Sequence, residues 1–240
     1  MSRLDPRLLL EGYATGIFPM ADSREADDLF WVEPRNRAII PLDRFHVSRS
    51  LKRTLRSGRF SVTHDRDFAA VIAGCADREE TWINAELERA MLALHGSGHA
   101  HSIEVWHGEK LVGGLYGVKL GRAFFAESMF SRMTDASKVA LAWLVARLKA
   151  GNFTLLDCQF MTEHLASLGA IAITRETYVA LLSAALGGGV AGGGAVDGLA
   201  GAADAPPDFA ALDRLLEIAG AAGAAGPAGY VIWQLLGQTS

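Results

Sequence analysis

The spacing of hydrophobic and polar residues changes along the chain and predicts different structures in different places. From residue 102 to 130, three apolar runs, "SIEVW", "KLVGGLYGVKL" and "RAFFAESMF", are separated by "HGE" and "LGR". Short apolar runs divided by turn residues are typical of consecutive antiparallel strands. The centre of the chain is therefore predicted to form a β-meander.

Helical spacing flanks this meander on both sides. After it, Asp135 is placed to cap a helix over "ASKVALAWLVARLKAG", which the strand "FTLLDCQ" and the helix "TEHLASLG" follow. Before it, helices are predicted at 6–13, 48–57 and 84–95. The pattern favours an α+β fold, in which helices pack on a largely antiparallel sheet.

An abrupt change after Leu186 suggests where the compact part ends. Seven of the fourteen residues from 187 to 200 are glycine, which is typical of a flexible linker. Beyond it, only "FAALDRLLEIAG" has a helical pattern. We expect three parts: a small N-terminal subdomain (1–45), a main domain (46–186) and a flexible Gly/Ala-rich C-terminal tail (187–240).

Composition narrows the class of protein. Half of the residues are hydrophobic, 21% are charged and the net charge is -4, which is a globular composition without a uniformly basic surface. Two cysteines are too few for a disulfide scaffold and fit a reducing cytoplasm. The uncharged stretch 218–240 is rich in Ala and Gly and is a weak candidate for a membrane span. We expect a cytoplasmic protein without a membrane role.

Two possible reactive clusters are disfavoured by their surroundings. His95, His99 and His101 have a spacing that could suggest a metal, but two glycines between the first two make a fixed ligand geometry hard to hold. A nucleophilic pair of Cys158 and His164 needs both side chains on one side, whereas strand alternation turns Cys158 away from its polar neighbours. We therefore expect no metal site.

The strand "FTLLDCQF" offers a carboxylate and an amide on one face. Alternation places Asp157 and Gln159 side by side. Such a pair can orient a substrate amine and accept its proton. Equally, Asp157 could cap the following turn and Gln159 satisfy a backbone group, and the residues alone leave the two readings open.

Glu127 is the one acid inside the apolar run "RAFFAESMFSR". A buried carboxylate is costly unless it is paired. Either Arg122, Arg132 or Lys138 neutralises it, or it awaits a cationic ligand such as an α-ammonium group.

The segment "SRSLKRTLRSGR" has a helical stripe of four cations and no acid. Such a stripe could follow a phosphate backbone, although a merely solvated helix face would look the same. The four are Arg49, Lys52, Arg53 and Arg56. Trp31 and Trp82, both flanked by polar residues, are candidates for amphipathic packing or for stacking on a nucleobase.

Taken together, these stretches resemble the bacterial leucyl/phenylalanyl-tRNA-protein transferases. The similarity is carried, in order, by "GIFPM", "FWVEPRNRAIIP", "FHVSRSLKR", "TWIN", "LHGSGHAHSIEVW", "LVGGLYGV", "FFAESMFSRMTDASKVAL", "LLDCQF" and "HLASLGA". It covers about three quarters of the chain, from about Leu8 to Leu182.

This resemblance implies a GNAT-like (acyl-CoA N-acyltransferase-like) domain that uses aminoacyl-tRNA and needs no cofactor. Family members transfer Leu or Phe, and less readily Met, to proteins with N-terminal Arg or Lys, which marks those proteins for N-end-rule degradation. We expect an aminoacyltransferase that acts as a monomer.

The resemblance also implies roles for individual residues. Asp157 and Gln159 would receive the proton of the attacking amine, and Glu127 would lie near the donor's α-amino group. Phe124, Leu115 and Leu141 would line the apolar pocket, Trp31 and Trp82 would hold the terminal adenosine, and the four cations would take the acceptor stem. Strict alternation of side chains along the strand would put Phe124 and Glu127 on opposite faces. A bulge near Ala126 is therefore expected.

Three departures from the family pattern limit these implications: a shortened N-terminal part, Leu115 and Ala126 where others can have Met and Gly, and an unfamiliar tail. Two alternatives stay open. An acyl-CoA-dependent N-acetyltransferase would need a pyrophosphate-binding turn, which "RMTDASK" lacks. A non-catalytic tRNA-binding module would need the cations and tryptophans but not Asp157 or Gln159.

Overall fold

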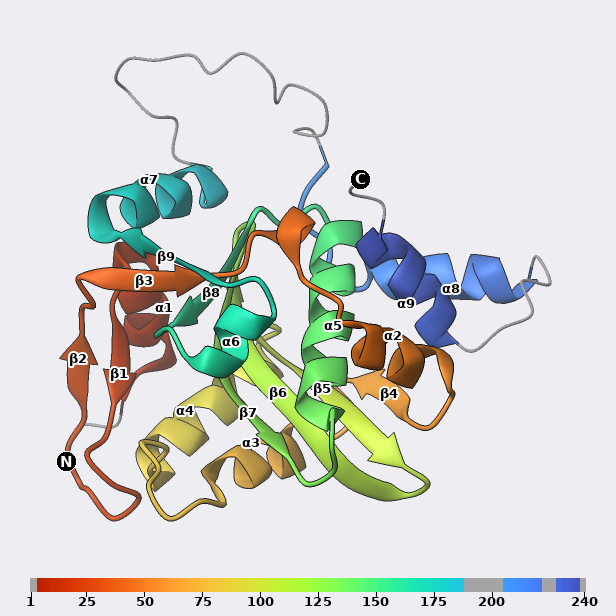
Figure 1. The fold of residues 1–240 in the computed structure, drawn as a ribbon. Helices are drawn as coiled ribbons and strands as arrows, with labels where there is room; N and C mark the ends of the chain where they lie inside the picture. The colour runs from red at the N-terminus through yellow and green to blue at the C-terminus, as the bar shows by residue number, and fades with distance from the viewer. Residues whose placement is uncertain (1–3, 188–204, 222–227, 238–240) are drawn as a thin grey trace, which may run out of the picture.

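The computed structural model describes residues 4–187, 205–221 and 228–237. A seven-stranded sheet with the order β4-β5-β6-β7-β8-β3-β9 forms its centre, and β1 and β2 form a separate pair (Figure 1). The strands are β1 (Phe18–Met20), β2 (Phe30–Val32), β3 (Asn36–Ile39), β4 (Ser61–His64), β5 (Ala100–His107), β6 (Lys110–Leu120), β7 (Ala123–Ser131), β8 (Leu155–Gln159) and β9 (Ile171–Thr174).

Neighbouring strands of the large sheet run antiparallel, with one exception. β7 and β8 are parallel, and α5 connects them. The α-helices are α1 (Pro6–Thr15), α2 (Arg49–Arg56), α3 (Phe68–Ala76), α4 (Ala85–Gly96), α5 (Ala136–Ala150), α6 (Glu163–Ser167), α7 (Arg175–Ala185), α8 (Ala211–Ala221) and α9 (Ala228–Gly237). The predicted meander and the α+β class are confirmed.

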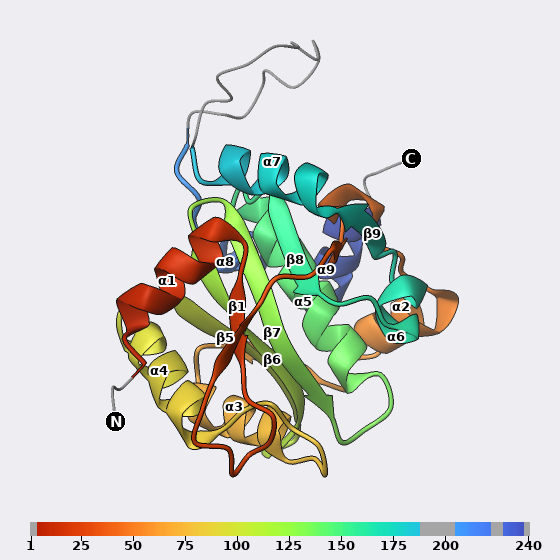
Figure 2. The same cartoon turned by 90° about the vertical axis from the view of Figure 1, so that its left-hand side faces the viewer.

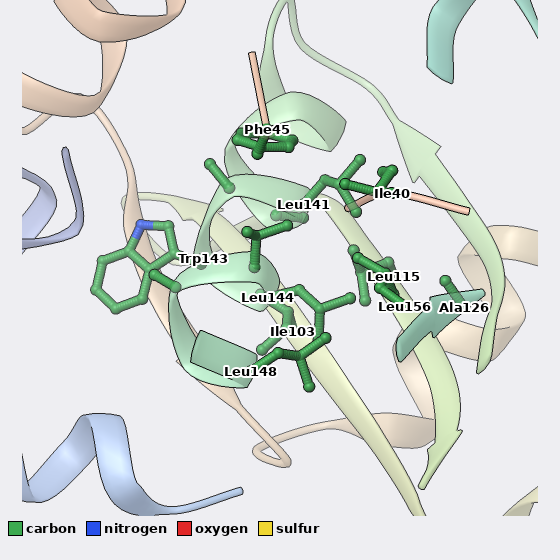
Figure 3. Packing of buried hydrophobic residues seen from close by; sticks show 14 of the residues in the cluster. Ile40, Phe45, Ile103, Leu115, Ala126, Leu141, Trp143, Leu144, Leu148 and Leu156 are labelled. Carbon is green, nitrogen blue, oxygen red and sulfur yellow. The ribbon is translucent and has the colours of Figure 1, made fainter. Parts of the chain in front are cut away.

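Helices cover both faces of the sheet. α5 packs on one face, and α3, α4 and α1 lie on the other (Figure 2). Two hydrophobic clusters fill the spaces between these layers. In the α5 cluster, Leu115 and Leu156 of the sheet meet Leu141 of the helix, and Ala126 lies at the edge (Figure 3).

Capping residues explain where several predicted helices begin. Ser48 and Asn84 each accept a hydrogen bond from a backbone N–H in the first turn of α2 and α4. Asp135 stands directly before α5 as expected, but its side chain makes no capping bond. Its carboxylate instead accepts a hydrogen bond from the Thr54 hydroxyl, at 3.1 Å, and so ties α5 to α2.

The exact limits of the three expected parts stay a prediction. Two features of the structure were not foreseen in that division. β3, within the supposed N-terminal subdomain, lies between β8 and β9 in the main sheet. The linker core 188–204 falls outside the described residues. Beyond it, α8 and α9 pack against α5, because Phe209, Leu212 and Ile232 supply buried apolar surface. The described part of the C-terminal segment is therefore folded onto the protein, and α9 was not expected.

Candidate active site

A separation between the two parallel strands creates the candidate site. The β7–β8 ladder ends at the pair Phe125–Asp157, although β7 continues to Ser131 and β8 to Gln159. A cavity of about 220 Å³ opens beside the diverging ends. It is lined by Met20, Arg78, Trp82, Ala126, Glu127, Ser128, Met129, Cys158, Gln159, Phe160, Thr162, His164 and Leu165.

A β-bulge brings Glu127 to this cavity. Tyr116 pairs with Ser128, and the next residue, Gly117, pairs with Ala126, so Glu127 is the extra residue of β7. Gly117 permits the close approach, because a Cβ atom there would lie 2.2 Å from the Phe125 carbonyl oxygen. The bulge expected near Ala126 is confirmed.

Glu127 has amide and phenol neighbours but no ion pair among the described residues. Its Oε1 accepts a hydrogen bond from Gln159 Nε2 at 2.7 Å. The Tyr13 hydroxyl lies near enough to lower the pKa of Glu127, although it falls outside hydrogen-bond geometry. Burial outweighs these effects and raises the pKa of Glu127 to about 7.

The cations considered for Glu127 are engaged elsewhere. Arg132 pairs with Asp77 and Lys138 with Asp135, while Arg122 donates to the Asn152 carbonyl oxygen at 2.8 Å. Of the two alternatives for Glu127, neutralisation by one of these three residues has no support among the described ion pairs. A carboxylate that faces a cavity without a paired cation has the chemistry to bind a cationic ligand.

Asp157 has the opposite environment. Arg37 Nε lies 3.0 Å from both of its carboxylate oxygens and Arg37 Nη2 lies 2.6 Å from Oδ2. The Tyr178 hydroxyl donates to Oδ2 at 2.8 Å, and the Gln159 backbone N–H donates to Oδ1 at 2.8 Å. Asp157 is fully buried and is not among the residues that line the cavity. The Asp157 carboxylate is therefore linked to the cavity only indirectly, by its hydrogen bond with the Gln159 backbone.

Gln159 itself adopts an unusual backbone conformation. Its φ angle is +62°, a left-handed value that is uncommon for residues other than glycine. The hydrogen bond from its N–H to Asp157 holds this turn and directs the side chain to Glu127. Strained residues of this kind cluster at functional sites, where the surrounding contacts fix them.

Arg37 is the main residue that the sequence reading missed. Its guanidinium lies between the rings of Phe18 and Tyr178, 4.6 Å from each centroid, and is 1% exposed. An arginine in the polar stretch "EPRNR" looks like a surface residue. Only its antiparallel neighbour β8 reveals it as the partner of Asp157.

The two tryptophans are not brought together. Trp82 lines the cavity, with Arg78 stacked on its ring at 5.2 Å. Trp31 instead packs over Gly12 of α1 and lines a different groove. Met20, which the sequence reading did not single out, lines the same cavity as Trp82.

The expected apolar residues lie close by, inside the core. Phe124, Leu115 and Leu141 are fully buried in the α5 cluster and do not line this cavity, whereas Ala126 belongs to both. Phe124 stacks on Phe209 with ring centroids 5.6 Å apart.

The basic stripe lies on α2, with Arg49, Arg53 and Arg56 exposed and Lys52 half-buried. The first turn of α5 connects it to the cavity: Asp135 binds Thr54 and Lys138, and the Lys138 charge adds to burial in lowering the pKa of His164 on the cavity wall.

Neither disfavoured cluster is supported. Cys158 and His164 both line the cavity, so the expectation that alternation turns Cys158 away from its polar neighbours is wrong. Burial nevertheless raises the pKa of the Cys158 thiol, which opposes formation of the thiolate that a nucleophile needs. Among the described residues, no group of His, Cys, Asp and Glu is placed to hold a metal ion. In the same part of the chain, no helix has the length and apolar character needed to cross a membrane.

Comparison with known proteins identifies similar chains. The family model described as leucyl/phenylalanyl-tRNA protein transferase matches residues 39–183, and the model for the N-terminal domain of that family matches residues 2–35. A leucyl/phenylalanyl-tRNA–protein transferase from Rhizorhabdus wittichii is 59% identical over the full length of both chains. One from Zymomonas mobilis is 64% identical over 76% of this chain and 70% of its own.

A solved structure described as L-PGS from Bacillus licheniformis matches with a TM-score of 0.38 and 14% identity, over 67% of this chain and 54% of that chain. A likeness at that level carries no argument about this protein.

Proposed function

Because this chain belongs to the leucyl/phenylalanyl-tRNA protein transferase family, we propose that it transfers leucine or phenylalanine from a charged tRNA to a protein acceptor. The acceptors are proteins with N-terminal Arg or Lys, methionine is a poorer donor, and the product is marked for N-end-rule degradation. The protein acts as a cytoplasmic monomer. The parallel pair β7–β8, which separates within an otherwise antiparallel sheet, supports a GNAT-like fold.

One observation carries the assignment of the site. Glu127 faces the cavity, and within the described part of the chain it has no paired cation and accepts a hydrogen bond from the Gln159 amide. The ionised carboxylate can therefore hold the α-ammonium group of the aminoacyl donor. That contact places the donor's ester carbonyl beside Gln159, at the end of β8.

The reaction then needs an amine positioned against this carbonyl. The acceptor's α-nitrogen attacks the carbonyl carbon, the new C–N bond forms, and the ester C–O bond to the terminal ribose breaks. The proton lost from the amine passes to the departing ribose oxygen. Since Gln159 Nε2 is held by Glu127, its Oε1 is the group that accepts a hydrogen bond from the attacking amine.

We expected Asp157 to receive this proton together with Gln159. Its carboxylate is enclosed by Arg37, Tyr178 and the Gln159 N–H, so the proposal gives Asp157 a positioning role: it fixes the backbone from which Gln159 points. Direct proton acceptance by Asp157 stays a prediction.

Other substrate contacts follow from the cavity wall. Trp82, which stacks with Arg78, is the residue proposed to hold the terminal adenosine, and Met20 takes the place proposed earlier for Trp31. Phe124, Leu115 and Leu141 shape the apolar end from behind Ala126. The cations of α2 bind the acceptor stem.

The test supplies radiolabelled leucyl-tRNA and a peptide that begins with Arg or Lys. Wild type should label the peptide without acetyl-CoA, whereas Glu127→Gln and Gln159→Ala should each lose at least tenfold in kcat/KM. Glu109→Gln, which makes the same change in the exposed β5–β6 turn, is the matched control and should match wild type.

Other outcomes point to the alternatives. Acetylation of the peptide from acetyl-CoA would favour an acyl-CoA-dependent transferase. Binding of charged tRNA without transfer under any condition would favour a non-catalytic tRNA-binding module. Full activity in Glu127→Gln would remove Glu127 from the donor site.

A further inference from the structure

The C-terminal segment is fixed to the body of the protein by a buried charge and a buried ring. Arg147 of α5 is 2% exposed and binds both carboxylate oxygens of Asp213 in α8, at 2.6 and 2.7 Å. Phe209 stacks on His101 and Phe124. These contacts hold the segment against α5, and α9 follows as its last described helix.

α9 lies directly on α2, the helix of the basic stripe. A Cβ atom on Gly229 would be only 2.0 Å from the Leu55 carbonyl oxygen, so the glycine permits this close approach. Gly229, Ile232 and Leu236 are the buried residues of α9. Tyr230 and Trp233, spaced one turn apart, lie towards the cations of α2.

The two rings contact two of the four cations. Lys52 Nζ lies 3.9 Å from the centre of the Trp233 ring. The Arg56 guanidinium carbon lies 5.4 Å from the Tyr230 centroid and 5.6 Å from that of Trp233. We call Lys52, Arg56, Tyr230 and Trp233 the α2–α9 surface.

This surface keeps its positive charge. The sequence of α9, "AGYVIWQLLG", contains no acid, and among the described residues none of the four cations of α2 makes an ion pair. A cation that rests on a ring stays charged and leaves its outer side free for an anion. Lys52 and Arg56 are thus held in place without being neutralised.

We propose that α9 is part of the tRNA-binding surface: its rings hold Lys52 and Arg56 ready for the phosphates of the acceptor arm. A free lysine or arginine loses side-chain freedom when it binds a phosphate, and a side chain already held on a ring loses less. This inference rests on the proposed function, because it requires that the protein binds charged tRNA.

The opposite arrangement, in which α9 shields the stripe from tRNA, is less consistent with the contacts. A helix that shielded cations would be expected to supply carboxylates to them, and α9 has none. Arg49, Arg53 and Arg56 also stay exposed beside it. The two arrangements predict opposite changes in affinity, so one experiment separates them.

The experiment measures binding of leucyl-tRNA to the full chain between 50 and 200 mM salt. Trp233→Leu, which keeps an apolar side chain but removes the ring, should weaken binding about three- to tenfold, the effect of freeing one or two long side chains. The slope of log affinity against log salt should stay the same, because no charge is lost. Lys52→Ala should instead reduce that slope by roughly one charge.

Three further variants make the result specific to the ring. Trp233→Phe should restore most of the affinity, and Gln234→Ala, on the exposed side of α9, should bind as wild type does. In a Lys52→Ala/Arg56→Ala background, Trp233→Leu should have no further effect. Matching thermal unfolding midpoints show that loss of affinity is not loss of fold.

Two results would overturn the inference. Tighter binding by Trp233→Leu would show that α9 covers the stripe, and unchanged binding would show that α9 takes no part in it. If wild type itself fails to bind leucyl-tRNA, the proposed function is wrong, and this failure is distinct from either of the other two.

Discussion

Glu127 and Asp157 are buried carboxylates on neighbouring strands, and the protein treats them in opposite ways. Asp157 accepts hydrogen bonds from Arg37, Tyr178 and a backbone N–H, so its charge is neutralised and solvated within the protein. Glu127 has the Gln159 amide and a cavity in front of it. If Glu127 binds the donor as proposed, burial alone does not mark a ligand-binding acid. The informative feature is a buried charge whose balance is left to the ligand.

The largest expected effect comes from removing Arg37, the cation that pairs with Asp157. Arg37→Met leaves Asp157 buried without its counter-ion, and breaking a buried pair in this way costs about 3–5 kcal/mol of unfolding free energy. Urea unfolding measures the loss. Arg175→Met, which breaks the exposed pair with Glu33, is the control and should cost less than about 1 kcal/mol. Equal losses would show that Asp157 does not depend on Arg37.

The second effect concerns Glu127. Here the native residue lowers stability instead of raising it. The pKa of Glu127 rises from an unfolded value near 4.5 to about 7, so the folded state holds its proton while the unfolded state loses it. The contribution of Glu127 to stability therefore falls by about 3 kcal/mol as pH rises from 4.5 to 7, and it stays level above pH 7.

Glu127→Gln removes this pH-dependent cost. The variant should be more stable than wild type by about 2–3 kcal/mol at pH 8 and equally stable at pH 4, where both side chains are neutral. Chemical denaturation at the two pH values tests it. A variant that is less stable at pH 8 would mean that Glu127 has a cationic partner in the folded protein.

Tyr178→Phe tests the surroundings of Asp157 with a smaller change. It removes one hydrogen bond to a charged group, which contributes about 1.5–3 kcal/mol. Tyr116→Phe is the matched control, because the Tyr116 hydroxyl is buried and has no hydrogen-bond partner among the described residues. That change should be neutral or slightly stabilising. If both variants lose the same stability, ring packing rather than the Asp157 contact explains the loss.

The sequence predicted the local parts of this arrangement well. The meander and α5 follow from side-chain periods and turn residues, which act over a few positions. The shared face of Asp157 and Gln159 stays a prediction, because Gln159 lines the cavity and Asp157 does not. Even the bulge at Glu127 could be inferred, because the family resemblance and strict alternation placed different residues in the pocket.

The partners across the sheet could not be predicted. Arg37 is 120 positions away from Asp157, and β3 had no sequence signal that it would lie beside β8. Met20 lines the cavity and Trp31 does not, because β1 and β2 form their own pair, in which Trp31 packs over Gly12 of α1. α9 is short and rich in Ala and Gly at its start, so only its contacts with α2 and α5 explain it.

The smallest effect identifies which of the two acids titrates during the reaction. If ionised Glu127 holds the donor's ammonium group, kcat/KM for leucyl-tRNA should fall about tenfold per pH unit below a midpoint near 7, which is about 1.4 kcal/mol per unit. The measurement uses a saturating acceptor peptide between pH 5.5 and 8. Glu127→Gln should lack this acidic limb and stay low throughout.

Asp157→Asn completes the comparison, because it changes the other acid while leaving Glu127 in place. Its activity should be lower than that of wild type, since Asn holds the Gln159 turn and Arg37 less well, but its acidic limb should persist. The midpoint should lie below that of wild type, because the Asp157 charge helps to raise the pKa of Glu127. If the limb vanishes in Asp157→Asn and persists in Glu127→Gln, the pH dependence does not arise from Glu127. The roles proposed for Glu127 and Asp157 would then have to be exchanged.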